Sequence, residues 1–115
     1  MADKPREVSQ EDFVEIHASG AKVIDVREAG EYATAHVPGA VLVPLSVISQ
    51  RFQDDVPAAG EGPVYVICAS GNRSLQATDF LRSHGIEAYS VAGGTNAWRL
   101  AGRDVVTGTE PTATA

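Results

Sequence analysis

The sequence predicts an α/β domain of three layers, with helices on both faces of a mostly parallel central sheet of about five strands. Short apolar runs alternate with segments of helical spacing, and this alternation is typical of parallel sheets connected by helices. The clearest apolar run, at residues 64–67, is rich in β-branched and aromatic residues and indicates a strand buried on both faces. At 115 residues the chain has the length of one ordinary domain.

The first half of the chain predicts three helices and two strands, each bounded by a residue that favours a cap or a turn. Ser9 is suited to cap a helix, because acidic residues follow it and Phe13 and Ile16 recur at helical spacing. Pro38 and Pro44 stand where an element must end. In chain order we expect a helix from Ser9 to about Gly20, a strand at 22–26, a short helix at 28–34, a turn at 36–39, a strand at 40–43 and a helix capped by Ser46.

The second half predicts two strands and two helices after a loop rich in Pro, Gly and Ala. In chain order we expect the loop at 57–63, a strand at 64–67, a polar turn at 70–74, a helix to about His84, a strand at 88–91, a tight turn at Gly93 and Gly94, and a helix capped by Thr95 and ended by Gly102. Residues 107–115 are rich in Thr, Gly, Pro and Ala. We therefore expect one domain at residues 5–106 and a disordered C-terminal tail at 107–115.

Charge and hydropathy narrow the classes of partner. The formal net charge of −6 weighs against nucleic acid, because phosphate binding needs clustered Lys and Arg. A small anionic substrate remains compatible, since a local site can be positive in a negative protein. No apolar run approaches the roughly 20 residues of a membrane-spanning helix, and no signal peptide is recognisable. We therefore expect a cytoplasmic protein with no membrane partner.

The single cysteine, Cys68, is the main candidate for chemistry. It follows the most buried predicted strand, and ligands of α/β sheets gather beyond the carboxyl ends of strands. If the next residues curl around the sulfur, their N–H groups form an anion-binding nest at a helix N-terminus. Gly71 permits such a curl and Arg73 adds a positive charge, so we expect a nucleophilic thiolate. The alternative is that Cys68 is a small core residue.

The other motifs give weaker evidence for a catalytic or binding site. A single cysteine forms neither an internal disulfide nor a Cys-only metal site, so we expect no metal and no cofactor. His17, His36 and His84 are scattered in the sequence and are read as surface or capping residues. The Gly93-Gly94 pair lacks the third glycine of a dinucleotide fingerprint and is read as a tight turn. Trp98, at helical spacing, is read as a core residue.

Three motifs occur in order along the chain. The first comprises residues 23–27, Glu31-Tyr32 and residues 36–40; the second is residues 68–74; the third is Gly93-Gly94 with Trp98 and Gly102. Together they resemble the signatures of the rhodanese homology domain, and the resemblance covers most of the chain. Ala35 and Asp104 depart from the family pattern, which often has Gly and Pro there.

The resemblance implies a rhodanese-like fold and a sulfurtransferase that carries sulfur as a persulfide on Cys68. The loop residues implied to bind the substrate are Ala69, Ser70, Gly71, Asn72, Arg73 and Ser74. The residues implied to support the site are Asp25, Arg27, Glu31 and His36. The expected partners are a small anionic sulfur donor such as thiosulfate or a persulfide, a thiol or cyanide acceptor, and possible sulfur-accepting proteins.

Two other functions stay open beside this one. Rhodanese-like domains also serve as non-catalytic persulfide carriers or regulatory binding modules. Related phosphatases and arsenate reductases have a Cys-x5-Arg loop, whereas Cys68 and Arg73 form the shorter Cys-x4-Arg, which by resemblance suits sulfur transfer. Ala69 and Ser70 are uncharged where some thiosulfate-specific members carry basic residues.

Overall fold

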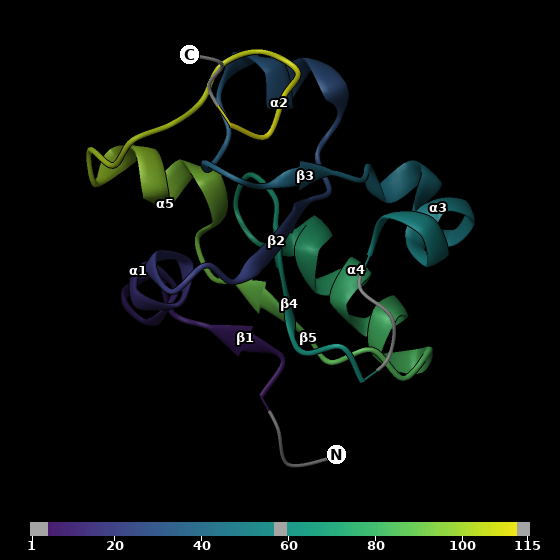
Figure 1. Cartoon of the computed structure of the whole chain (residues 1–115). Helices are drawn as coiled ribbons and strands as arrows, with labels where there is room; N and C mark the ends of the chain where they lie inside the picture. Colours follow the sequence, from purple (N-terminus) through teal and green to yellow (C-terminus); the bar gives the residue numbers. More distant parts are fainter. Residues whose placement is uncertain (1–4, 57–59, 113–115) are drawn as a thin grey trace.

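The computed structural model describes residues 5–56 and 60–112, and within them five strands form one sheet in which all neighbouring strands are parallel (Figure 1). The strand order is β1-β5-β4-β2-β3, so the predicted α/β fold is confirmed. In chain order the elements are β1 (Glu7–Val8), α1 (Gln10–Ala18), β2 (Lys22–Asp25), α2 (Ala29–Thr34), β3 (Val41–Leu42), the 3-10 helix η1 (Leu45–Val47), α3 (Ile48–Asp55), β4 (Val64–Ile67), α4 (Asn72–Ser83), β5 (Ala88–Val91) and α5 (Gly94–Leu100).

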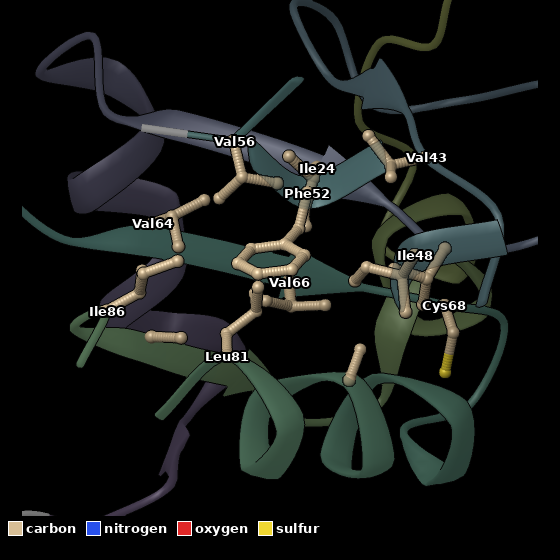
Figure 2. Close-up of a cluster of buried hydrophobic side chains, with 13 residues drawn as sticks. Ile24, Val43, Ile48, Phe52, Val56, Val64, Val66, Cys68, Leu81 and Ile86 are labelled. Carbon is tan, nitrogen blue, oxygen red and sulfur yellow. The ribbon is translucent and has the colours of Figure 1, made fainter. Parts of the chain in front are cut away.

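Helices cover both faces of the sheet and enclose two apolar clusters. On one face, α1 and α5 bring Phe13 and Trp98 into edge contact, with ring centroids 5.6 Å apart. On the other face, α3 and α4 bring Phe52 and Leu81 over Val66 of β4 (Figure 2). No helix in the described part of the chain is long and apolar enough to cross a lipid bilayer.

The alternation of side chains along β4 decides where Cys68 points. Successive residues of a strand face opposite sides of the sheet. Val64 and Val66 belong to the cluster beneath α3 and α4, and Ile67 belongs to the opposite cluster. Cys68 continues the first series, and its sulfur lies at the end of the cluster, beside the first turn of α4 (Figure 2).

The structure differs from the sequence prediction at the short elements. β1 was not predicted, because it spans two residues and pairs only with β5. The helix predicted after Ser46 begins as η1, and Ser46 directs its hydroxyl to the Glu28 carboxylate rather than to the helix. Thr95 does not cap α5, because the helix already begins at Gly94. Part of the predicted loop at 57–63 lies outside the described residues.

Ordered contacts extend beyond residue 106, the boundary expected from composition. The Gly108 N–H donates to the Ala33 carbonyl at 2.8 Å, and the Gly39 N–H donates to the Pro111 carbonyl at 2.9 Å. This segment, yellow in Figure 1, lies beside α2 at the end of the sheet. Residues 113–115 of the expected tail lie outside the described residues.

Candidate active site

The loop after β4 curls around the sulfur of Cys68. The backbone N–H of Gly71 donates to Cys68 Sγ at 3.0 Å. Gly71 has a φ of +119°, a conformation that a residue with a side chain rarely adopts. It is also the N-cap of α4, and no side chain caps this helix. The sulfur therefore lies where the first turn of a helix offers N–H groups and the positive end of its dipole.

Two opposing effects act on the Cys68 thiol, and the result is a lowered pKa. Burial is the largest single effect and raises the pKa, since the residue is 1% exposed. Hydrogen bonds to the sulfur from the Ser74 hydroxyl and from three backbone N–H groups together outweigh burial and lower the pKa. These N–H groups belong to Ser70, Gly71 and Ser74. The sulfur is thus packed in the core and also accepts hydrogen bonds, so it has features of both interpretations of the single cysteine.

The buried hydroxyls of Ser74 and Ser90 form a hydrogen-bonded pair next to the Cys68 sulfur. Ser74 Oγ is 3.4 Å from Cys68 Sγ, 2.7 Å from Ser90 Oγ and 3.1 Å from the Gly71 carbonyl oxygen. Ser90 lies on β5 and, like Ser74, is fully buried. A hydroxyl has one proton, so Ser74 can donate to a thiolate while it accepts a hydrogen bond from Ser90.

Arg73 forms an ion pair with Glu31 through two hydrogen bonds. Its Nη1 and Nη2 donate to the two carboxylate oxygens of Glu31 at 2.8 and 2.9 Å. The hydrogen bonds from Arg73, then the backbone N–H of Glu28, lower the pKa of Glu31 to about 2. The pKa of Arg73 is raised, chiefly by Glu31 and further by the charges of Cys68 and Asp25. The pair therefore joins α2 to the active-site loop.

Asp25 and Arg27 form a buried ion pair at the end of β2, next to β4. Arg27 Nη2 donates to Asp25 Oδ2 at 2.8 Å and to the Ala35 carbonyl at 2.7 Å. Asp25 also accepts a hydrogen bond from the backbone N–H of Arg27 at 3.1 Å. These bonds fix both ends of α2, which carries Glu31. Asp25 and Arg27 thus reach the loop through α2 and not by direct hydrogen bonds.

His36 is the predicted support residue that lies away from the sulfur. Its ring is buried and stacks on Tyr32, with centroids 3.6 Å apart. Nδ1 lies 2.8 Å from the Tyr32 carbonyl oxygen and Nε2 lies 2.8 Å from the Glu110 carbonyl oxygen. His36 therefore fastens the C-terminal segment to α2. Of its expected roles, surface or capping, the surface position was wrong, whereas the contact with the Tyr32 carbonyl in the last turn of α2 is of the capping kind.

The remaining predicted loop residues differ in position. Asn72 is exposed at the start of α4, and Ala69 turns its carbonyl oxygen toward α5. Sequence reasoning missed Ser90 and the first residues of α5 as neighbours of the loop. A polar residue inside the apolar strand 88–91 was the available signal for Ser90. The contacts of α5 are made by its backbone, which leaves no such signal.

The chain matches a family model and several known proteins over most of its length. Residues 9–101 match the model of the rhodanese-like domain. Among curated relatives, the thiosulfate sulfurtransferase GlpE of Pseudomonas entomophila is 30% identical over 95 residues, which cover 82% of this chain and 84% of GlpE. The adenylyltransferase and sulfurtransferase UBA4 of Yarrowia lipolytica is 32% identical over 91 residues, 79% of this chain. The matched part spans only 23% of UBA4.

Solved structures give the same result. A rhodanese-related protein of Thermoplasma volcanium has a TM-score of 0.79 at 30% identity, with 91% of this chain and 99% of that chain covered. The human single-domain sulfurtransferase TSTD1 has a TM-score of 0.77 at 28% identity, with 84% of this chain and 97% of that chain covered. By fold and by sequence, the chain belongs to the rhodanese-like domain family.

Proposed function

We propose that the chain is a sulfurtransferase that moves a sulfane sulfur from a donor to a thiophilic acceptor through a persulfide on Cys68. The observation that carries this proposal is the Cys68 sulfur lying 3.0 Å from the Gly71 N–H in a loop that lowers its pKa. Relatives named as sulfurtransferases support the reaction class.

The first half-reaction transfers a sulfur atom to Cys68. The Cys68 thiolate attacks the outer sulfur of thiosulfate, a new S–S bond forms, and the S–S bond of the donor breaks. The electron pair of the broken bond leaves with sulfite, and the terminal sulfur of the persulfide keeps the negative charge that it carried in the donor. The N–H groups of the loop are suited to stabilise that sulfur, as backbone donors stabilise oxyanions elsewhere.

The second half-reaction removes the sulfur atom from the Cys68 persulfide. Cyanide or a thiolate attacks the terminal sulfur, takes it as thiocyanate or a new persulfide, and returns Cys68 as a thiolate. A covalent intermediate of this kind predicts ping-pong kinetics. No general base is needed when the thiolate is already formed, which is consistent with a site that has no histidine hydrogen-bonded to Cys68 among the described residues.

The donor and acceptor remain parts of the proposal. Small donors, thiosulfate or a small persulfide, are proposed over bulky ones because the Cys68 residue is only 1% exposed. The similarity to UBA4, whose name includes sulfurtransferase, supports the reaction class, and a sulfur-accepting protein is a further candidate acceptor. Phosphatase or arsenate reductase activity is disfavoured, because the Cys68-x4-Arg73 loop is one residue shorter than the Cys-x5-Arg loop of those enzymes.

Mass spectrometry tests the proposal directly. After treatment with thiosulfate, the wild type should gain one sulfur atom on Cys68, and cyanide should remove it with release of thiocyanate. Cys68→Ser should do neither. An adduct that forms but is discharged only slowly by every acceptor would identify a carrier instead. Failure to form any adduct with thiosulfate or with a small persulfide would overturn the proposal.

A further inference from the structure

The turn before α5 packs directly against the outer side of the Cys68 loop. The Thr95 N–H donates to the Cys68 carbonyl oxygen at 2.8 Å, and the Asn96 N–H donates to the Ala69 carbonyl oxygen at 3.0 Å. Both donors belong to the first turn of a helix, where N–H groups have no partner within the helix. Two successive loop carbonyls are therefore held by α5, on the side away from the sulfur.

Holding a carbonyl also fixes the next N–H. In a trans peptide the C=O and the following N–H lie in one plane and point in opposite directions, and the described residues contain no cis peptide. Once Asn96 binds the Ala69 carbonyl, the N–H of Ser70 must point the opposite way. That N–H is one of the groups that lower the pKa of Cys68. The hydrogen bonds from α5 thus set the direction of a donor that faces the sulfur.

Gly94 is what allows α5 to come this close. Its φ is +58°, and a Cβ atom placed on it would overlap the Cys68 carbonyl oxygen. The same Cβ would lie 2.6 Å from the Ala69 carbonyl oxygen and 2.7 Å from the Ala69 carbonyl carbon. These are backbone atoms, which cannot rotate away as a side chain can, so any residue other than glycine must push the loop and α5 apart.

Gln10, at the start of α1, holds the same turn from the other side. Its side-chain amide Nε2 donates to the Ala92 carbonyl at 2.8 Å and to the Gly94 carbonyl at 3.0 Å. The turn is therefore fixed between α1 and the active-site loop.

We propose that Gly94 is a positioning residue for Cys68, because it lets the backbone of α5 hold the Cys68 and Ala69 carbonyls and so aims the Ser70 N–H at the sulfur. The inference rests on the proposed function only in taking the Cys68 thiolate as the reacting group. Its primary readout, the ionisation of the thiol, needs no sulfur donor.

The test compares Gly94→Ala with Gly102→Ala in the full chain. Gly102 lies at the other end of α5 and has a φ of +76°, but a Cβ there meets no atom within 4 Å. The rate of Cys68 alkylation by iodoacetamide is followed against pH. For G94A we expect the midpoint to rise by about one pH unit, the order of effect when an anion loses one hydrogen bond. For G102A we expect the wild-type midpoint.

Sulfur transfer gives a second readout. At a pH below the wild-type midpoint, G94A should lower kcat about tenfold, in proportion to the lost thiolate. A folded G94A with the wild-type midpoint would overturn the proposal. If the midpoint shifts as expected but neither protein transfers sulfur, the proposed function fails and the positioning role stands.

A second variant decides the matter if G94A does not fold. Gln10→Leu removes both hydrogen bonds to the turn without adding an atom beside the loop. The midpoint should then rise by a few tenths of a pH unit, in the same direction. A folded Q10L that titrates as the wild type does would, in that case, contradict the proposal.

Discussion

Glu31 on α2 and Arg73 on α4 are joined by two parallel hydrogen bonds of 2.8 and 2.9 Å, although 42 positions separate them in the sequence. The same Glu31 carboxylate accepts the backbone N–H of Glu28 at 3.0 Å and so helps to cap α2. One side chain therefore begins a helix and anchors the loop that surrounds Cys68.

Replacing Glu31 by Gln should lower stability in a pH-dependent way. The pKa of Glu31 falls from 4.5 to about 2 on folding, so its contribution is complete above pH 4.5 and is lost as the pH falls toward 2. The two side chains are 35% and 39% exposed, so solvent screening limits the loss at pH 7 to about 1 kcal/mol or less. Urea unfolding at several pH values should show the gap between wild type and E31Q closing near pH 2. A gap that is constant with pH would contradict this account.

Breaking the buried ion pair between Asp25 and Arg27 should lower the free energy of unfolding much more than Glu31→Gln does. Asp25→Asn leaves the guanidinium of Arg27, whose side chain is 7% exposed, without its counter-charge. Loss of one partner of a buried pair typically destabilises by about 3–5 kcal/mol. Denaturant unfolding should show a loss several times that of E31Q. Equal losses in the two variants would show that the Asp25–Arg27 pair is not the stronger link.

Ser90 should act on the sulfur through Ser74. Without the Ser90 hydroxyl, Ser74 loses its hydrogen-bond partner at 2.7 Å, and with it the arrangement in which Ser90 donates to Ser74 while Ser74 donates to the thiolate. We expect Ser90→Ala to raise the pKa of Cys68 by roughly half a unit and, at a pH below the wild-type midpoint, to slow alkylation about threefold. The exposed Ser83, whose hydroxyl bonds only to α4 and His84, offers the control Ser83→Ala. Similar alkylation rates in S90A and S83A would refute a role for Ser90.

Gly71 should be needed for activity and not only for stability. Its φ of +119° makes alanine strained there, at a cost of about 1–2 kcal/mol, although a Cβ would find its nearest neighbour, the Gly93 nitrogen, at 3.8 Å. Relief of that strain would turn the Gly71 N–H away from the sulfur. Gly71→Ala should therefore lose both stability and sulfur transfer. Gly20→Ala, with a φ of +88° and open space, should lose only stability. If G71A transferred sulfur at the wild-type rate, the Gly71 N–H would not be needed for activity.

The sequence was most informative where many residues repeat one signal. The apolar runs at 22–26 and 64–67 predicted β2 and β4 nearly to the residue, because burial on both faces demands continuous apolar side chains. β1 carries no such run, since its two residues need only pair with β5. Composition predicted a disordered tail after residue 106. It could not predict the contact of His36 with the Glu110 carbonyl oxygen, because every residue has a backbone carbonyl.

The loop of the candidate site could be predicted from the sequence, but its contacts with α2 and α5 could not. Gly71 after an apolar strand and before a helix indicated a loop that could curl around Cys68. The pairing of Arg73 with Glu31 could not be read from spacing, because it depends on how α2 and α4 pack. The hydrogen bonds from α5 to the loop are made by backbone groups and need the absence of a Cβ at Gly94. They could therefore not be predicted from the sequence.

The proposed chemistry depends on backbone N–H groups that lower the pKa of Cys68 despite its burial. The most direct measurement is a pH titration of thiolate absorbance in the ultraviolet, with Cys68→Ser subtracted as the blank. The account predicts a midpoint clearly below the value of about 8.5 that is usual for a free cysteine. A midpoint at or above that value would show that burial prevails over the loop, and the account would be wrong.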